Sequence, residues 1–437
     1  MFFIQGKEVN FMSITLRAIK TIALCACAAL LLMTAPAAAQ DMQKAYTADE
    51  LAKVREWEKT WAGKKIDQTN VDQVAQFLPE HFVTVMKNPD TWGAPPEGYF
   101  FTIRPYEFVP EAPNFVAASK ANAGKCTLNA DGYLENLANL AGRPFIDPGE
   151  DGVKMAWNFE MQNRGDTFHY RKYSPNVNPK SRSERLADQD YWEYYFINRT
   201  ELDPKPAIPK NPRGYRRGYF LHMYLPAEFL NTRMYSLRYI DQDKEDDAYL
   251  WYSQYRRIRR MNTAQRTDAI DGSDLIYDDE YLWDGQLLRN NYTYKGKKEL
   301  LADRHDGMGR ATQNPGQVLS NNLTFERCNF LVIDVINKDP NYLYSKRIWY
   351  LDPETYIILW TDIYDQQGRY WKMDFNSTQP LKAMTGVMKP VIVGTHFFDI
   401  QRTHGGSANS QRITQPEISN PAITDEMFTT SYLQKVN

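Results

Sequence analysis

Strand-like runs that are apolar on both faces are the feature that most constrains the fold of this chain. In residues 219–225, the odd positions hold Tyr, Leu, Met and Leu, and the even positions hold Phe, His and Tyr. An antiparallel strand with one face in water alternates apolar and polar residues, so this strand needs cover on both faces. The sequence therefore predicts helices on one face and either a second sheet or a ligand in a curved half-barrel on the other.

Runs of the same kind recur from Tyr191 onward. Aromatic residues, which favour strands, make up 14% of the sequence. Tight turns separate several runs, as at 352–355 and 366–368, which is typical of a meander of antiparallel strands. The predicted strands cover residues 191–198, 218–226, 234–240, 249–260, 328–336, 343–351, 356–365, 369–375 and 391–402.

The part of the chain before these strands is predicted to be helical. Residues 46–91 begin with Thr47 and Glu50, which match a capping box, and apolar residues then recur at helical spacing. An N-terminal helical segment, residues 40–97, therefore precedes a sheet domain, residues 98–437. A short helical turn is expected to close the chain near its end.

The first 39 residues have the pattern of an export signal. Arg17 and Lys20 precede an apolar stretch at 21–34, and small residues follow at 35–39. A basic start, an apolar stretch of this length and a small-residue cleavage site together define a secretory signal peptide. We therefore expect residues 1–39 to be removed on export.

The charge balance and the lack of catalytic motifs narrow the function classes. The chain has 52 Lys and Arg against 54 Asp and Glu, so it has no basic field that would attract nucleic acid. After the signal, the sequence contains no HExxH, Walker A, GxSxG or CxxC motif. His222 and His396 lie in apolar strands, where a core position is favoured over metal ligation. We expect no nucleic acid, cofactor, metal site or enzymatic activity.

Two cysteines, Cys126 and Cys328, remain after the signal. An oxidising compartment would allow them to form a disulfide. They could equally be two separately buried small hydrophobes. The sequence alone does not set the distance between them, so both alternatives stay open.

A basic strand followed by an acidic segment is the densest group of charges. Acidic residues at 268–284 could bind calcium or act as an acid–base pair, but their spacing is not that of a calcium loop. A loop entering a helix, capped by Ser273 or Asp274, is favoured, with the arginines paired to it. The charged residues singled out are Arg256, Arg257, Arg259, Arg260, Asp274, Asp278 and Asp279.

In this order, the basic strand and the acidic segment resemble a motif of the bacterial domain-of-unknown-function family 1329 (DUF1329), which is similar to the outer-membrane lipoprotein-sorting (LolA/LolB) superfamily. Residues 139–145 and 154–159 resemble a further pair of family motifs, and the turn at 352–355 resembles the hairpin of the lipoprotein-sorting fold. Ile146 departs from the family pattern, which usually has a proline there. The resemblance covers residues 47–435.

The resemblance implies an α+β fold in which an antiparallel sheet curls into an incomplete barrel, with helices covering or plugging its concave face. It also implies a periplasmic carrier of the Gram-negative envelope for a lipid, a lipoprotein acyl chain or another lipophilic molecule. Its partners would be an inner-membrane transporter of the resistance–nodulation–division type and an outer-membrane protein. The candidate cavity residues are Phe220, Tyr224, Trp251, Trp349 and Trp360.

A second function class stays open, that of an envelope carbohydrate-binding protein or glycosidase. Aromatic side chains stack on sugar rings, and paired carboxylates hydrolyse glycosidic bonds. Such a protein would show a flat aromatic platform with two carboxylates about 5–9 Å apart. A carrier would instead show a closed apolar cavity without ionisable groups.

Overall fold

The computed structural model describes most of the chain from residue 44 onward. The described ranges are 44–178, 184–262, 266–270, 273–305, 317–320, 323–409 and 416–435. They belong to one compact unit. Within them, no helix is long and apolar enough to cross a membrane. The predicted signal peptide, residues 1–39, lies outside the described residues.

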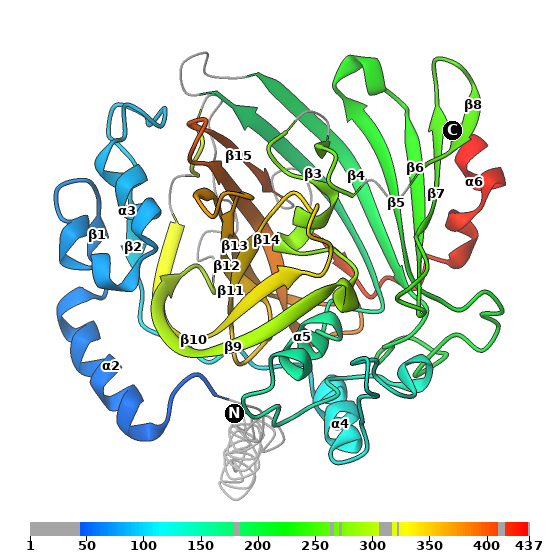
Figure 1. Cartoon of the computed structure of the whole chain (residues 1–437), viewed down its shortest axis with the longest axis horizontal. Helices are drawn as coiled ribbons and strands as arrows, with labels where there is room; N and C mark the ends of the chain where they lie inside the picture. The colour runs from blue at the N-terminus through cyan, green and yellow to red at the C-terminus, as the bar shows by residue number, and fades with distance from the viewer. Residues whose placement is uncertain are drawn as a thin grey trace, which may run out of the picture. The chain divides into compact units, whose positions relative to one another are not determined.

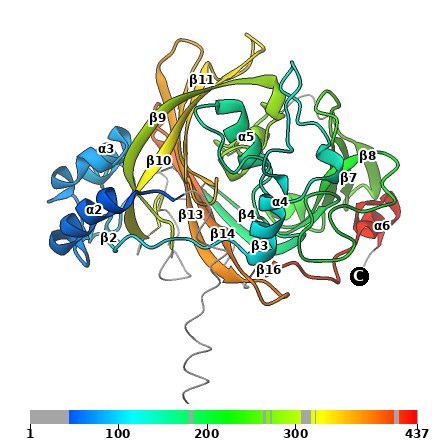
Figure 2. The same ribbon diagram turned by 90° about the horizontal axis from the view of Figure 1, so that it is seen from below.

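One curled sheet contains the sixteen strands of the described residues, and Figures 1 and 2 show how it bends around its contents. Neighbouring strands follow the order β1-β2-β10-β11-β12-β13-β14-β15-β3-β4-β5-β6-β7-β8, with β9 beside β10 and β16 beside β3. Only β2 and β10 pair in parallel among these strands. In the described ranges no pairing joins β8 to β9, so the expected incomplete barrel is confirmed.

The strands and helices have the following bounds. The strands are β1 (Lys65–Ile66), β2 (Phe101–Ile103), β3 (Thr167–Val177), β4 (Arg185–Tyr195), β5 (Tyr215–Leu225), β6 (Arg233–Tyr239), β7 (Asp247–Tyr252), β8 (Arg257–Arg260), β9 (Asn290–Ala302), β10 (Leu323–Asn337), β11 (Lys346–Leu351), β12 (Ile358–Tyr364), β13 (Tyr370–Lys382), β14 (Met388–Asp399), β15 (His404–Asn409) and β16 (Glu417–Ile418). The helices are α2 (Ala48–Trp61), α3 (Glu80–Lys87), α4 (Pro113–Asn122), α5 (Gly152–Glu160) and α6 (Thr430–Gln434), and the 3-10 turns include η7 (Tyr277–Leu282), η8 (Leu287–Arg289) and η9 (Asp425–Phe428). Strands β10 to β14 are consecutive in sequence and in space, which confirms the predicted meander.

The run 249–260, predicted as one strand, is instead a hairpin of β7 and β8. Arg256 in its turn has a left-handed φ of 49°. The turn, residues 253–256, contains no Gly, Pro, Asn or Asp, and Ser253 is its one residue of a type that usually marks turns. The neighbouring turn between β5 and β6 holds it in place, because Gln254 Nε2 donates a hydrogen bond to the carbonyl oxygen of Glu228 at 3.1 Å.

Two N-terminal helices cover the outer face of β10 to β14, outside the curl (Figure 2). The predicted capping box is present at the start of α2. Phe82 of α3 packs with its ring centroid 5.2 Å from that of Trp360 and 5.9 Å from that of Phe375. Aromatic packing of this kind buries large apolar areas on both partners. The N-terminal helical segment is therefore part of the core of the sheet.

Helix α5 and the irregular segment around η7 lie inside the curl (Figure 2). The helix starts at Asp151, whose side chain accepts hydrogen bonds from the backbone of the first turn. Phe159 of α5 and Trp283, just after η7, both pack on Trp349 of β11, at centroid distances of 5.2 and 5.6 Å. The inner face of the meander is therefore closed by aromatic contacts.

The C-terminal η9 and α6 cover the outer face of β5 to β7. Phe428 and Tyr432 join one apolar cluster with Phe220 of β5. On the other face of the same strand, Leu221 belongs to an inner cluster with Tyr281 of η7. The predicted cover on both faces is confirmed, but the inner cover is an irregular segment of the chain rather than a second sheet or a ligand.

Candidate functional site

Three arginines converge on one carboxylate inside the curl. Asp284 pairs with Arg217 of β5, with Arg238 of β6 at 3.2 Å and with Arg266 at 3.3 Å. Burial alone would raise the pKa of Asp284, but the guanidinium groups hold it well below its ordinary value. Asp246 also pairs with Arg238 and Arg266, at 3.0 and 3.2 Å. We call these five residues the ionic cluster.

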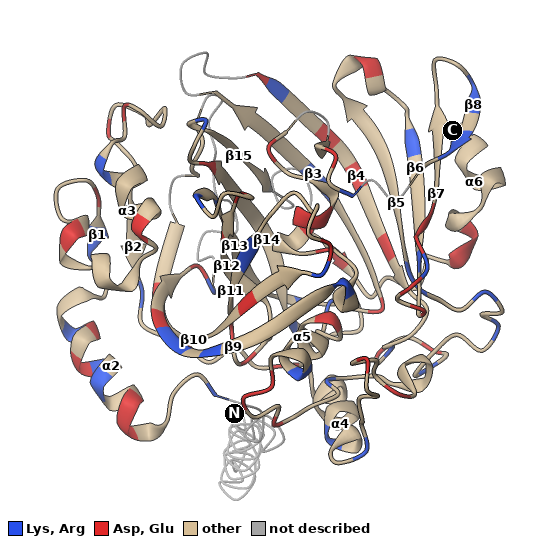
Figure 3. Cartoon of the chain, in the orientation of Figure 1, with Lys and Arg blue, Asp and Glu red and all other residues tan. Residues whose placement is uncertain are grey.

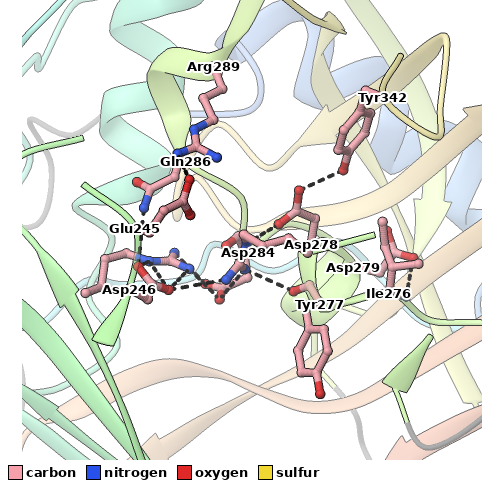
Figure 4. A network of polar contacts seen from close by, with 12 residues as sticks. Glu245, Asp246, Ile276, Tyr277, Asp278, Asp279, Asp284, Gln286, Arg289 and Tyr342 are labelled. Atoms are coloured by element: carbon pink, nitrogen blue, oxygen red, sulfur yellow. Dashed lines mark hydrogen bonds and ion pairs between the residues drawn. The ribbon is translucent and has the colours of Figure 1, made fainter. Parts of the chain in front are cut away.

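The ionic cluster anchors residues 273–289, which we call the inner segment. Earlier in this segment than Asp284, Asp279 lies 2.6 Å from the guanidinium of Arg347 and accepts a hydrogen bond from Tyr344 at 2.9 Å. Burial opposes ionisation of Asp279, yet Arg347 and Lys372 lower its pKa. Asp278 accepts a hydrogen bond from Tyr342 Oη at 2.8 Å (Figure 4).

The helix predicted after Ser273 or Asp274 is instead the short 3-10 turn η7, and Asp279 accepts the backbone N–H of Ile276 at its start. Asp274 does not cap this turn. Its carboxylate instead pairs with the imidazole of His404 in β15. The hydrogen bond that His404 donates to Asp274, together with the contact to Glu184, raises the pKa of His404.

The arginines of the predicted motif do not pair with the inner segment. Arg256, Arg257 and Arg259 are exposed in the β7–β8 turn and in β8, and Arg260 pairs with Asp247 at 2.7 Å. The expected pairing is wrong because the inner segment lies within the curl, where arginines of β5, β6 and β11 reach it. Adjacency in the sequence does not become adjacency in space here.

The gaps that the inner segment leaves against the sheet are small. One gap of about 50 Å³ is lined by Tyr219, Met223, Met234 and Tyr277 among others, and another, beside Trp283, measures about 20 Å³. Pockets for drug-sized ligands measure about 300–1,000 Å³. The inner face is therefore occupied by the chain itself.

A cavity of about 520 Å³ lies on the outer face of β5 to β7, beside η9 and α6. Phe196, Tyr215, Tyr235, Leu237 and Phe428 form its buried walls, and Tyr249 is part-buried there. Buried Asp247 also belongs to the wall, and the rim carries exposed Lys210, Arg213, Asp425, Thr429 and Thr430, together with Asn211 and Pro212. We call this space the outer cavity. The expected carrier cavity, closed, apolar and without ionisable groups, is not what the structure has, because Lys210, Arg213, Asp247 and Asp425 line this one. Its aromatic walls and charged rim instead suit an amphiphilic ligand.

Two local features shape the outer cavity. A Cβ atom on Gly218 of β5 would come within 2.8 Å of the Phe428 ring, so the glycine lets this ring lie directly on the strand. Asp247 in the wall is kept ionised, because hydrogen bonds from Tyr239 and Arg260 outweigh burial and lower its pKa. Burial and the nearby Tyr249 raise the pKa of Tyr235 to about 12.

The aromatic residues predicted to line a cavity are divided among different parts of the fold. Phe220 and Trp251 belong to the outer cluster under α6, and Trp360 lies beneath α3. Trp349 is covered on the inner face by α5, and Tyr224 donates a hydrogen bond to Asp190 at 2.6 Å. The structure does not bring these five side chains together, and none of them lines the outer cavity.

Cys126 and Cys328 are both free and belong to different apolar clusters. Of the two alternatives left open by the sequence, the structure therefore has the unpaired one. Burial raises the pKa of both thiols. Among the residues that the structure describes, no group of three His, Cys, Asp or Glu side chains could hold a metal ion.

The residues of the outer cavity were not predicted from the sequence. Tyr235 and Leu237 alternate with inward-facing residues along a predicted strand, which places them on one face. The sequence does not indicate that residues 210–213 and 425–430 meet at that face.

The fold and cavities define a class of protein: an unclosed antiparallel barrel that is filled by a charged segment and holds a cavity on its outer face. The chain belongs to the DUF1329 family, described as a protein of unknown function, whose model matches residues 65–434. The resemblance seen in the sequence is thereby confirmed.

Relatives of the chain include both sequences and solved structures. The uncharacterized protein PA3922 of Pseudomonas aeruginosa is 24% identical over 323 residues, which cover 70% of this chain and 67% of that protein. A DUF1329 family protein from Desulfovibrio piger has 14% identity and a TM-score of 0.45 over 66% of this chain and 99% of its own. A LolA superfamily protein from Nitrosomonas europaea has 11% identity and a TM-score of 0.36 over 63% of this chain and 94% of its own.

Proposed function

We propose that the protein is a periplasmic binding protein that carries an amphiphilic, mainly lipophilic molecule within the bacterial envelope. The observation that supports this is the outer cavity, whose volume of about 520 Å³ is within the range of small-molecule sites. Binding would be driven by burial, because each CH₂ group removed from water contributes about 0.8 kcal/mol. No covalent step is needed.

The outer cavity also indicates how the ligand would be oriented. Tyr235 and Phe428 are buried in its wall, so the apolar part would lie against their rings. The exposed amino and guanidinium groups of Lys210 and Arg213 would meet an anionic head group at the rim. A ligand with a tail and a negative head, such as an acidic lipid or a fatty acid, combines both contacts.

The place of this carrier in the envelope follows from the sequence. The predicted signal peptide would send the protein to the periplasm. Its proposed partners are an inner-membrane exporter of the resistance–nodulation–division type and an outer-membrane protein. Only the family resemblance supports these two partners.

A ligand-binding experiment tests the proposal. The protein is purified from the periplasm and analysed by native mass spectrometry for a bound molecule, then delipidated and titrated with a fluorescent C16 fatty acid. Thr430→Trp would fill the outer cavity from its exposed rim without removing a buried contact. We expect it to weaken binding by about tenfold or more, which corresponds to about 1.4 kcal/mol.

Ser431→Trp is the matched control, because Ser431 is exposed next to Thr430 but does not line the cavity. It should bind the fatty acid like the wild type. Equal affinity of Thr430→Trp and wild type would place binding elsewhere. A protein that takes up glycans but no lipophilic molecule would favour the carbohydrate-binding alternative and overturn the proposal.

A further inference from the structure

Two neighbouring hairpin turns at one end of β5 to β8 expose apolar side chains beside a row of arginines. Leu225 and Leu230 are 37% and 49% exposed at the β5–β6 turn, and Tyr255 is 67% exposed in the β7–β8 turn. Large apolar groups are not normally left in water side by side with each other. We call residues 225–231 and 253–260 together the arginine edge.

Contacts between the two turns hold the arginine edge in shape. Ser253 Oγ donates a hydrogen bond to the carbonyl oxygen of Leu230 at 2.6 Å, and Gln254 Nε2 donates one to that of Glu228 at 3.1 Å. Both bonds join one turn to the other. The exposed Leu and Tyr side chains are therefore presented together, from one end of the sheet.

Positive charge is concentrated at the same place (Figure 3). Arg256, Arg257 and Arg259 are exposed. The other charged groups of the edge are already in ion pairs, Arg260 at 2.7 Å and Glu228 at 3.1 Å from their partners. Since the whole chain has a net charge of −2, this cationic edge differs in sign from the protein that carries it.

We propose that the arginine edge docks on the surface of an anionic lipid bilayer. Exposed apolar side chains enter the boundary between head groups and acyl chains, and nearby cations meet the lipid phosphates. Tyr255 suits this position, because tyrosine rings are enriched at membrane interfaces. The turns would enter the head-group layer with their tips.

A purely protective role for the arginines explains less of the structure. Charged side chains do guard free edge strands against pairing with other chains, and β8 is the last strand of the sheet. Protection does not explain why Leu230 and Tyr255 stay exposed on the adjoining turns. An acidic protein partner is the competing occupant, because Tyr and Arg are also enriched at protein interfaces, but its binding would not depend on vesicles.

Membrane docking goes beyond the proposed carrier function, because it would give the carrier a membrane surface at which to exchange its ligand. It can be tested without any ligand. The protein from Gln40 onward is used, because the apolar stretch 21–34 would bind vesicles by itself. Binding is measured by flotation with vesicles of phosphatidylcholine alone and of phosphatidylcholine with phosphatidylglycerol. We expect binding to the anionic vesicles that weakens as salt increases.

The triple variant Arg256→Gln, Arg257→Gln and Arg259→Gln should weaken binding to the anionic vesicles on the order of 100-fold, which is about fivefold for each arginine. Leu230→Ser with Tyr255→Ser should weaken it as well, at unchanged net charge of the arginine edge. The matched control changes three exposed lysines of the N-terminal segment to Gln: Lys53, Lys59 and Lys64. It should bind as the wild type does.

Three results would overturn membrane docking: equal loss in the lysine control and the arginine variant, equal binding to neutral and anionic vesicles, or no binding to either. Retention by an immobilised acidic polypeptide without any vesicle binding would also overturn it and indicate a protein partner. The fatty-acid titration of the same variants is scored separately. A variant that loses vesicles but keeps the fatty acid distinguishes docking from ligand binding.

Discussion

Asp284→Asn should be among the most destabilising conservative changes inside the curl. The neutral amide leaves the guanidinium of Arg217, whose side chain is 7% exposed, without its carboxylate partner. Breaking a buried ion pair by removing one member costs about 3–5 kcal/mol. Arg238 and Arg266 keep Asp246, so we place the loss of unfolding free energy at about 3 kcal/mol, the lower end of that range.

Urea unfolding followed by tryptophan fluorescence measures this loss. The control is Asp241→Asn, which removes an exposed carboxylate 3.7 Å from Lys244 and should cost below about 1 kcal/mol. The pKa of Asp284 is lowered in the folded state, so its contribution is present above the ordinary aspartate pKa of about 3.9 and is lost as pH falls below it. An Asp284→Asn penalty as small as that of the control, or one that grows on acidification, would refute the reasoning.

Three further predictions concern other parts of the structure. Gly218→Val should displace the Phe428 ring, lowering both the unfolding midpoint and fatty-acid affinity, whereas an unchanged affinity would separate this ring from the outer cavity. The pKa of His404 is raised in the folded state, so its stabilising effect is present below the unfolded pKa of about 6.5 and is lost at higher pH; the midpoint difference between wild type and His404→Gln should therefore shrink from pH 6 to about pH 9. In thiol labelling with Ellman's reagent, part-exposed Cys126 should react slowly in the native protein and buried Cys328 only after unfolding; a protein without reactive thiols in urea would instead contain a disulfide.

The strands of the meander were predictable because their signals are local, whereas β3 and β9, which carry several charged residues, were not among the predicted runs. The run 356–365, for example, is rich in aromatic and β-branched residues and has turns on either side, which predicts a strand. Strand β12 forms within it. The division of 249–260 into two strands was not predictable, since its turn is stabilised by Gln254 and the distant Glu228. The order of β10 to β14 in the sheet was also predictable, because short turns connect successive strands of the meander.

The ionic cluster could not be read from the sequence, because its members come from separate strands. Arg217 and Arg238 lie 21 positions apart, yet both bind Asp284 inside the curl. Each sits at an inward position of an otherwise aromatic strand, where a charge requires a buried partner. The acidic segment 268–284 supplies that partner, Asp284, to Arg217 and Arg238. It does not supply one to the arginines of β8, which are closer to it in the sequence.

The two proposals follow from this division of charge between the inside and the edge of the sheet. Arginines that enter the curl are neutralised by the inner segment, which fills the space where a lipophilic ligand was expected. Arginines at the end of β8 stay outside and exposed. The outer cavity lies on β5 to β7, and the arginine edge lies at the turns that join β5 to β6 and β7 to β8. A ligand site and a membrane contact would therefore be carried by the same strands, β5 to β7. The meander of β10 to β14, packed on both faces, would then act as the rigid support for that half of the sheet.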